Sequence, residues 1–393
     1  MGPLDRAASV LRRVLTTGTP SNRLLRIGLG LVALLVCLGA LADLVRGYPR
    51  GADLEIALRA AERWMAGGQP YVAEAFSQGP GYDLPFLYPP YALPLFAPLT
   101  VIDRGLLHPL WFVAGVAIAY ATCRRLGIRR QWIPAVLVWP PFAEALISGN
   151  IQTAIFAAFV ALLVGRAGSA IGRADAAEAG DATDVVAPAE DPAAARPRTA
   201  VGRGLLITIT TFLKVSQPHV LVHLVRRERR AVLVAIAVIV LLALATLPVT
   251  GTTLWLDWIA QLRRAADPGW ALGGPSLSNS LPAPLGILVV IGCLGAVVAV
   301  PRASAAVWVG VLLVVGATSL HTYYLLFLLP AMLRIRLEIA LIGALMVATY
   351  TEIGWWIAIV LVVGTLVASR WQSVLLETRA PERRPAGAGA VAA

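Results

Sequence analysis

Residues 231–248 read AVLVAIAVIVLLALATLP and contain no charged side chain. An uninterrupted apolar stretch of this kind approaches the roughly 20 residues with which an α-helix crosses the hydrocarbon core of a bilayer. Similar stretches with few or no charges lie near residues 27–45, 285–300, 303–318 and 354–369. Backbone polar groups in lipid must be hydrogen-bonded within the protein, and these stretches are continuous rather than alternating, so we expect helical spans and not a barrel.

The composition of the 393-residue chain indicates the same class. Hydrophobic residues make up 58% of the chain and charged residues 14%, whereas soluble globular domains carry about 25% charged residues. This composition excludes an ordinary soluble enzyme. We predict an all-α fold, a polytopic integral membrane protein with about 10–12 transmembrane helices.

The formal net charge of +11 comes almost entirely from arginine, because Lys214 is the only lysine. The arginines cluster at the ends of the apolar stretches, which is typical of cytoplasmic loops under the positive-inside rule and does not indicate nucleic-acid binding. Examples are residues 12–13, 124–130, 226–230 and 379–384. The N-terminus and the C-terminus are therefore both expected in the cytoplasm.

These features divide the chain into five parts. The divisions are a cytoplasmic N-terminus (1–26), an N-terminal membrane half (27–166) with an external loop (46–85), a disordered linker (167–203), a C-terminal membrane half (204–370) and a cytoplasmic tail (371–393). The linker is rich in Ala, Asp, Glu, Gly and Pro and has no aromatic residue, so it has too little apolar surface to fold.

Residues 53–66 of the external loop have the period of an amphipathic helix at the membrane interface, ending at Gly67 and Gly68. Its apolar positions are Leu54, Leu58, Ala61 and Met65.

Two further apolar segments are interrupted, at residues 86–99 by prolines and at residues 214–218 within 205–225. If both cross the membrane fully, the arginines at 124–130 lie outside; if both are re-entrant, these arginines lie inside. The positive-inside rule favours the second topology.

Asp53 is the sharpest candidate for chemistry in the external loop. It either caps the amphipathic helix or acts as a catalytic carboxylate, and the two roles are compatible. Asp53 and Glu55 have the spacing of an acidic metal motif, but helical residues two apart do not face the same direction. The chain also has no Walker A, HExxH or CxxC motif, so we expect neither a metal site nor a cofactor.

A series of short motifs resembles glycosyltransferase family 87 over most of the chain, apart from the linker and the tail. The matching stretches, in order, are Asp53 at the start of a helix, GQPY at 68–71, FLYPP at 86–90, LFAPL at 95–99, GNIQ at 149–152, KVSQP at 214–218 and HTYY at 321–324. Members of this family are polytopic GT-C-class enzymes that use polyprenyl-phosphate sugars, and many are actinobacterial α-1,2-mannosyltransferases.

The resemblance implies that Asp53 is the base of an inverting transfer at the outer face of the plasma membrane, in a multi-pass protein of cell-envelope biogenesis. The expected partners are a polyprenyl-phosphate sugar, with mannose as the sugar, a glycolipid or envelope-glycan acceptor, and membrane lipids. An arabinofuranosyl donor is the alternative within the family. A multi-pass lipid or glycan transporter and a noncatalytic scaffold are the alternatives outside it.

Five further residues are candidates for substrate binding, each with a structural alternative. His321 and Lys214 would bind the departing phosphate, or they would serve as an interfacial histidine and a snorkelling lysine. Tyr88 would line the groove for sugar or lipid, or anchor the interface. Asn150 and Gln152 would hydrogen-bond the sugar, or link helices.

Overall fold

The structure is a computed structural model that describes residues 28, 31, 34, 35, 38, 39, 41, 42, 45, 46, 50–72, 84–128, 130–164, 199–211, 218–265, 276–334 and 352–379. All regular secondary structure in these residues is helical and none of it is β-strand, so the predicted all-α class is confirmed for the described part of the chain.

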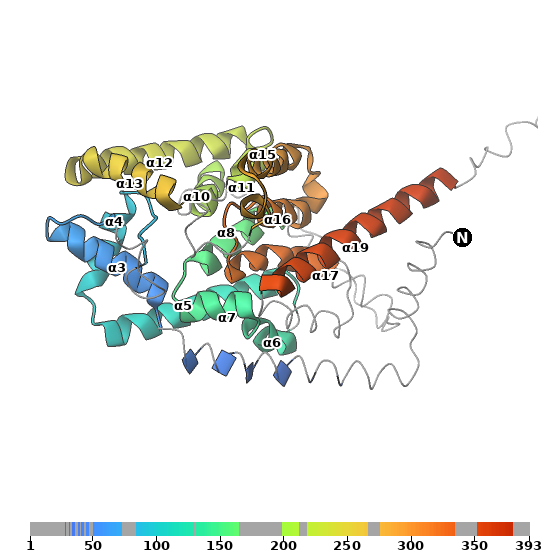
Figure 1. The fold of residues 1–393 in the computed structure, drawn as a ribbon, viewed down its shortest axis with the longest axis horizontal. Helices are drawn as coiled ribbons and strands as arrows, with labels where there is room; N and C mark the ends of the chain where they lie inside the picture. The colour runs from blue at the N-terminus through green and yellow to red at the C-terminus, as the bar shows by residue number, and fades with distance from the viewer. Residues whose placement is uncertain are drawn as a thin grey trace, which may run out of the picture.

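The helices of the first half are drawn in blue to green in Figure 1. They are α3 (Ala52–Met65), α4 (Ala92–Phe96), η2 (Ala97–Val101), α5 (Arg104–Arg125), η3 (Arg130–Trp132), α6 (Ile133–Leu137), α7 (Pro140–Ile147) and α8 (Gln152–Leu163). The second half contains α10 (Ala200–Thr211), α11 (His219–Leu224), α12 (Arg229–Thr250), α13 (Thr253–Ala265), α14 (Leu277–Ser280), α15 (Ala283–Ala299), η6 (Arg302–Ser304), α16 (Ala305–Val315), η7 (Thr322–Leu328), α17 (Leu329–Arg334) and α19 (Glu352–Arg379).

The two halves pack directly against each other, since α10 contacts α8 and η7 contacts α7. The core between the halves contains four phenylalanine rings in mutual contact, with centroids 5.0–6.2 Å apart. Gly310 of α16 lets this core close, since a Cβ there would lie 2.2 Å from the carbonyl oxygen of Phe327. The close approach of α16 to η7 therefore requires glycine at this position. The four rings are Phe142, Phe156, Phe159 and Phe327.

Two helices, α5 and α12, are long and apolar enough to cross a membrane by length and composition. Each has 22 residues, which corresponds to about 33 Å of helix. On α12 the apolar side chains of Leu233 and Leu241 are each 64% exposed, as expected of a lipid-facing surface. The larger number of spans remains a prediction, since the other apolar helices of the described residues are shorter or fall outside these criteria.

Helix α3 occupies the range predicted for the amphipathic helix. Gly67 has a φ of +74°, and the amides of Gly67 and Gly68 bond back to the carbonyls of Trp64 and Arg63, which ends the helix as the sequence predicts. The helix does not lie alone at an interface, however: α4 and η2 pack against it. Of its predicted apolar positions, Met65 is exposed and the others are buried.

The interrupted segment at 86–99 contains a non-helical stretch followed by the short helices α4 and η2. Helix α10 begins at Ala200, inside the range predicted for the linker, and α19 continues to Arg379, past the predicted end of the membrane half. The interruption at 214–218 lies outside the described residues except for Pro218, and the choice between the two topologies remains a prediction.

Candidate active site

The candidate site is built on the turn between α7 and α8, residues 148–150. Gly149 has a φ of +72°, a conformation that favours glycine. Its amide bonds to the carbonyl of Leu146, and the amide of Asn150 bonds to the carbonyl of Ala145 at 2.9 Å. This pair of bonds is a Schellman motif, which ends α7 and turns the chain into α8.

The start of α3 lies directly on the end of α7. The amide of Gly51 donates to the carbonyl of Ile147, and the amide of Asp53 donates to the carbonyl of Ser148, both at 2.8 Å. The first amides of a helix and the last carbonyls of another have no partners inside their own helices, so this arrangement satisfies both sets. A Cβ on Gly149 would lie 3.0 Å from the Cβ of Leu54, so the contact is close.

The prediction that Asp53 caps the amphipathic helix is wrong. Gly51 occupies the N-cap position, no side chain caps α3, and Asp53 is the second residue of the helix. The amide of Asp53 already has a backbone partner across the junction, and its carboxylate is directed to a different group. A negative side chain in the first turn still suits the positive end of the helix dipole.

The carboxylate of Asp53 accepts a hydrogen bond from the side-chain amide of Asn150, with 2.8 Å between Oδ2 and Nδ2. The other end of that amide, Oδ1, accepts from the backbone N–H of Gln152 at 2.8 Å. Three of the residues selected from the sequence therefore form one connected group. Asn150 is 6% exposed and Gln152 is fully buried, so this group is held within the protein.

Tyr88 borders the same carboxylate. Burial raises the pKa of the Tyr88 phenol above its usual value, and the negative charge of Asp53 raises it further. The ring packs against Phe86 and Phe96, with centroids 5.4 and 6.0 Å away. Tyr88 thus remains a protonated hydrogen-bond donor beside Asp53.

His321 contacts two tyrosines, Tyr323 and Tyr324. Its ring stacks on Tyr323 with centroids 5.2 Å apart, and it also stacks on Tyr324. The Nε2 atom of His321 is 3.3 Å from the hydroxyl of Ser319. Tyr323 in turn interacts electrostatically with Asp53 and Tyr88, and its helix η7 packs against α7, which ends at the turn that carries Asn150.

Lys214 lies outside the described residues, and its role remains a prediction.

Sequence reasoning missed Tyr323 and Glu144 as neighbours of the site. Tyr323 lies within the HTYY stretch at 321–324, and Glu144, on α7, interacts electrostatically with it. A signal for Glu144 was present, because it is the one acidic residue in the otherwise apolar stretch 133–147. Acidic groups are expensive at membrane depth and are functional candidates there.

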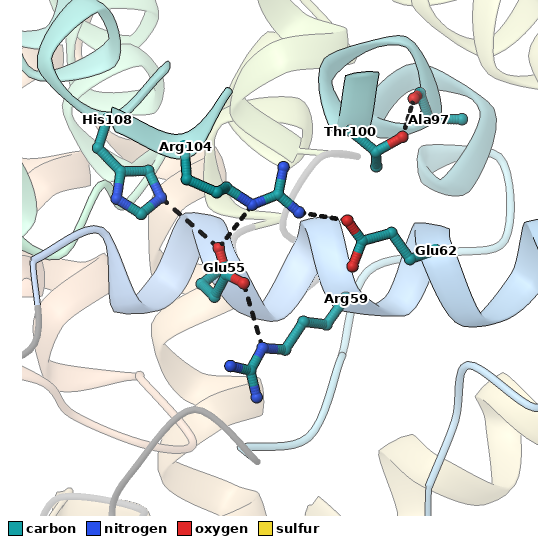
Figure 2. A network of polar contacts seen from close by, with 7 residues as sticks. All are labelled: Glu55, Arg59, Glu62, Ala97, Thr100, Arg104 and His108. Carbon is teal, nitrogen blue, oxygen red and sulfur yellow. Dashed lines mark hydrogen bonds and ion pairs between the residues drawn. The ribbon is translucent and has the colours of Figure 1, made fainter. Parts of the chain in front are cut away.

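Glu55 has other partners than Asp53, as expected of helical residues two apart, and Figure 2 shows them. Its carboxylate pairs with Arg59 and with Arg104 of α5, each at 3.1 Å, and lies 3.6 Å from Nε2 of His108. Arg104 also pairs with Glu62. These five side chains, which we call the α3–α5 charge network, join the two helices rather than forming a site with Asp53.

Helix α13 packs against Gln69 and the segment 84–91. Gln69 donates to Asp257 of α13 at 2.8 Å, and the indole N–H of Trp258 donates to the carbonyl of Leu87 at 3.1 Å. Trp255 packs against Tyr91. Helix α13 therefore holds the segment that carries Tyr88.

In the described residues, these features define a helical protein with two helices of membrane length and a carboxylate–amide pair at a junction of helix ends. The chain belongs to glycosyltransferase family 87, which it matches over residues 86–285. The matched range contains Tyr88, Asn150 and Gln152, whereas Asp53 and His321 lie outside it.

A relative of known name is the polyprenol-phosphate-mannose-dependent alpha-(1-2)-phosphatidylinositol pentamannoside mannosyltransferase of Mycobacterium tuberculosis (strain CDC 1551 / Oshkosh). The two are 28% identical over 170 residues, which cover 40% of this chain and 36% of that relative. The similarity thus spans little more than a third of the relative's length. No solved structure matches the chain.

Proposed function

We propose that this protein is an inverting membrane glycosyltransferase. It transfers mannose from a polyprenyl-phosphate donor to a lipid-linked or cell-envelope glycan at the outer face of the plasma membrane. The observation that carries the proposal is the hydrogen bond between Asp53 and Asn150. It joins a carboxylate outside the family-matched range to an amide inside that range.

The proposed sugar transfer requires one action of the Asp53 carboxylate, the removal of a proton. An acceptor hydroxyl attacks the anomeric carbon of the donor, the bond from that carbon to the phosphate oxygen breaks, and polyprenyl phosphate leaves. Asp53 takes the hydroxyl proton as the new bond forms. Because the phosphate is a good leaving group, a base on the opposite face suffices, as in inverting glycoside hydrolysis. A β-linked donor would give an α-linked product.

The neighbouring side chains fit the remaining tasks. Asn150 fixes Oδ2 of Asp53, which leaves Oδ1 for the acceptor proton in this proposal. Tyr88 is protonated beside the carboxylate, and its hydroxyl is suited to hydrogen-bond a sugar oxygen. His321, stacked on Tyr323, is suited to hydrogen-bond the departing phosphate.

Two observations support the finer assignments. The name of the Mycobacterium tuberculosis relative supports mannose as the transferred sugar. For the outer face, α12 has the basic turn at 226–230 at one end and Thr250 at the other, where α13 follows and contacts Gln69, just after α3, and Leu87, next to Tyr88. If the basic turn is cytoplasmic, the candidate site lies outside.

The test compares three purified full-length proteins for transfer of radiolabelled mannose from polyprenyl-phosphate mannose to a membrane lipid extract. We expect transfer by the wild type, loss of transfer in Asp53→Asn, and retained transfer in Glu62→Gln. The last variant makes the same carboxylate-to-amide change on the same helix, at a side chain that is 46% exposed.

Equal transfer by the wild type and Asp53→Asn would reject Asp53 as the base. No transfer by the folded wild type would reject mannose. The next donor to test would then be a polyprenyl-phosphate arabinofuranose, followed by a transport assay.

A further inference from the structure

A cavity with a volume of about 660 Å³ borders the α3–α7 junction that carries Asp53. This is within the range of roughly 300–1,000 Å³ that is typical of ligand pockets. Its walls include Gly51 and Gly149 of the junction, Leu54 of α3, and side chains from α5, α6 and α7. Asp53, Asn150 and Tyr88 are not among the residues that line it, so the cavity is separate from the candidate active site.

The lining is apolar apart from a few groups. Among the described residues that line the cavity there is no acidic side chain, and Arg50 is the one permanently charged group. Arg50 is exposed as well as lining the cavity, so it marks a place where the cavity reaches the surface. His108 also lines the cavity, but its Nε2 atom faces Glu55 in the α3–α5 charge network (Figure 2).

The cavity opens along a membrane-length helix. Phe112 of α5 lines it and is 43% exposed, so bilayer lipid can reach the lining on this side. The lining residues of α5 belong to the part of the helix nearest α3. An apolar interior with an arginine at its edge is complementary to an acyl chain that carries an anionic phosphate headgroup.

We propose that this cavity binds one acyl chain of an anionic phospholipid of the surrounding bilayer, with the phosphate on Arg50. The chain would pack against Leu54 and against the backbone of Gly51 and Gly149, the groups that hold Asp53 in place from behind. A bilayer phospholipid fits better than the sugar donor, because a donor must bring its reacting bond to Asp53, and Asp53 does not face this cavity.

The test uses a phosphatidylglycerol with a photoactivatable acyl chain, added to the purified full-length protein, and maps the labelled peptides. We expect labelling of the peptides of α5 and α7 that line the cavity. Val116→Trp, which fills the cavity from α5, should abolish this labelling, whereas Val113→Trp should not. Val113 is on the same helix, is 63% exposed and does not line the cavity. Leu137→Trp fills the cavity from α6 and serves if Val116→Trp does not fold.

The charge is tested separately. Arg50→Gln should reduce labelling by phosphatidylglycerol about fivefold and should remove the preference for it over a phosphatidylcholine with the same chain. Labelling that survives both Val116→Trp and Leu137→Trp would overturn the proposal. Displacement of the label by polyprenyl phosphate would overturn it as well, by giving the cavity to the donor. Every readout here is binding, so the outcome is independent of whether the proposed transfer is observed.

Discussion

The side-chain amide of Asn150 makes two hydrogen bonds, one through its oxygen and one through its nitrogen. The first of these bonds fixes the orientation of the amide. Its Oδ1 accepts from the amide of Gln152 at the start of α8, so the nitrogen must face the carboxylate of Asp53. The turn that places it depends on Gly149, whose positive φ ends α7. The residue therefore connects helix capping to the proposed chemistry.

Two variants of Asn150 separate these two hydrogen bonds. Asn150→Ala should lower kcat about tenfold or more, because it removes a hydrogen bond to a charged group, and should also destabilise the protein by about 1 kcal/mol, because the amide of Gln152 loses its side-chain acceptor. Asn150→Asp keeps an oxygen that can accept from this amide but places a second carboxylate beside Asp53. The two like charges raise the pKa of one carboxyl, so Asn150→Asp should lose transfer and should be less stable than the wild type. Transfer assays and unfolding midpoints of both variants check this, and full activity in Asn150→Asp would contradict the assigned contact.

Gly149→Ala should destabilise the protein more than Gly67→Ala. The two glycines have φ values of +72° and +74°, so the conformational penalty for alanine, about 1 kcal/mol, is the same. A Cβ on Gly149 meets Leu54 at 3.0 Å, whereas a Cβ on Gly67 meets nothing within 4 Å. The difference between their free energies of unfolding measures the tightness of the α3–α7 junction. Equal values would show that the junction is loose.

At the scale of helices, the ion pairs of the α3–α5 charge network join α3 to α5 (Figure 2). The carboxylate of Glu55 is 13% exposed and that of Glu62 is 46% exposed. Charge-assisted bonds are strong where water is excluded and weak where it is present. Glu55 should therefore carry most of the stabilisation.

Glu55→Gln should lower the free energy of unfolding by about 2 kcal/mol, and Glu62→Gln by no more than about 0.5 kcal/mol. Chemical denaturation in detergent gives both values, and amide hydrogen exchange shows whether α3 is the element that loosens. A larger effect for Glu62→Gln would contradict the burial argument.

The sequence predicts helix α3 well because the signals are local. Its apolar period and the glycines at 67 and 68 are all within one stretch of chain. The pair of Asp53 and Asn150 could not be predicted from spacing, because the two residues are 97 positions apart and meet only when α7 ends under α3. Both residues were selected individually, but their contact depends on how three helix ends pack.

At the scale of the whole molecule, α12 relates the candidate site to the membrane. It begins at Arg229, beside the basic turn, and after it ends at Thr250 the chain continues into α13. Helix α13 contacts Gln69 through Asp257, and it contacts the backbone of Leu87 through Trp258. The basic turn and the contacts of α13 with Gln69 and Leu87 are therefore near opposite ends of a helix of membrane length.

This arrangement predicts opposite accessibility for two introduced cysteines. In a protein with Cys37, Cys123 and Cys293 replaced by alanine, Met65→Cys at the end of α3 should react with a membrane-impermeant thiol reagent on intact cells. Met65 is 51% exposed. Arg226→Cys, in the basic turn, should react only after the cells are permeabilised, because arginine-rich turns remain in the cytoplasm. The reverse pattern would place Asp53 on the cytoplasmic side and reject the outer-face proposal, whereas labelling of both positions on intact cells would show that α12 does not separate two compartments.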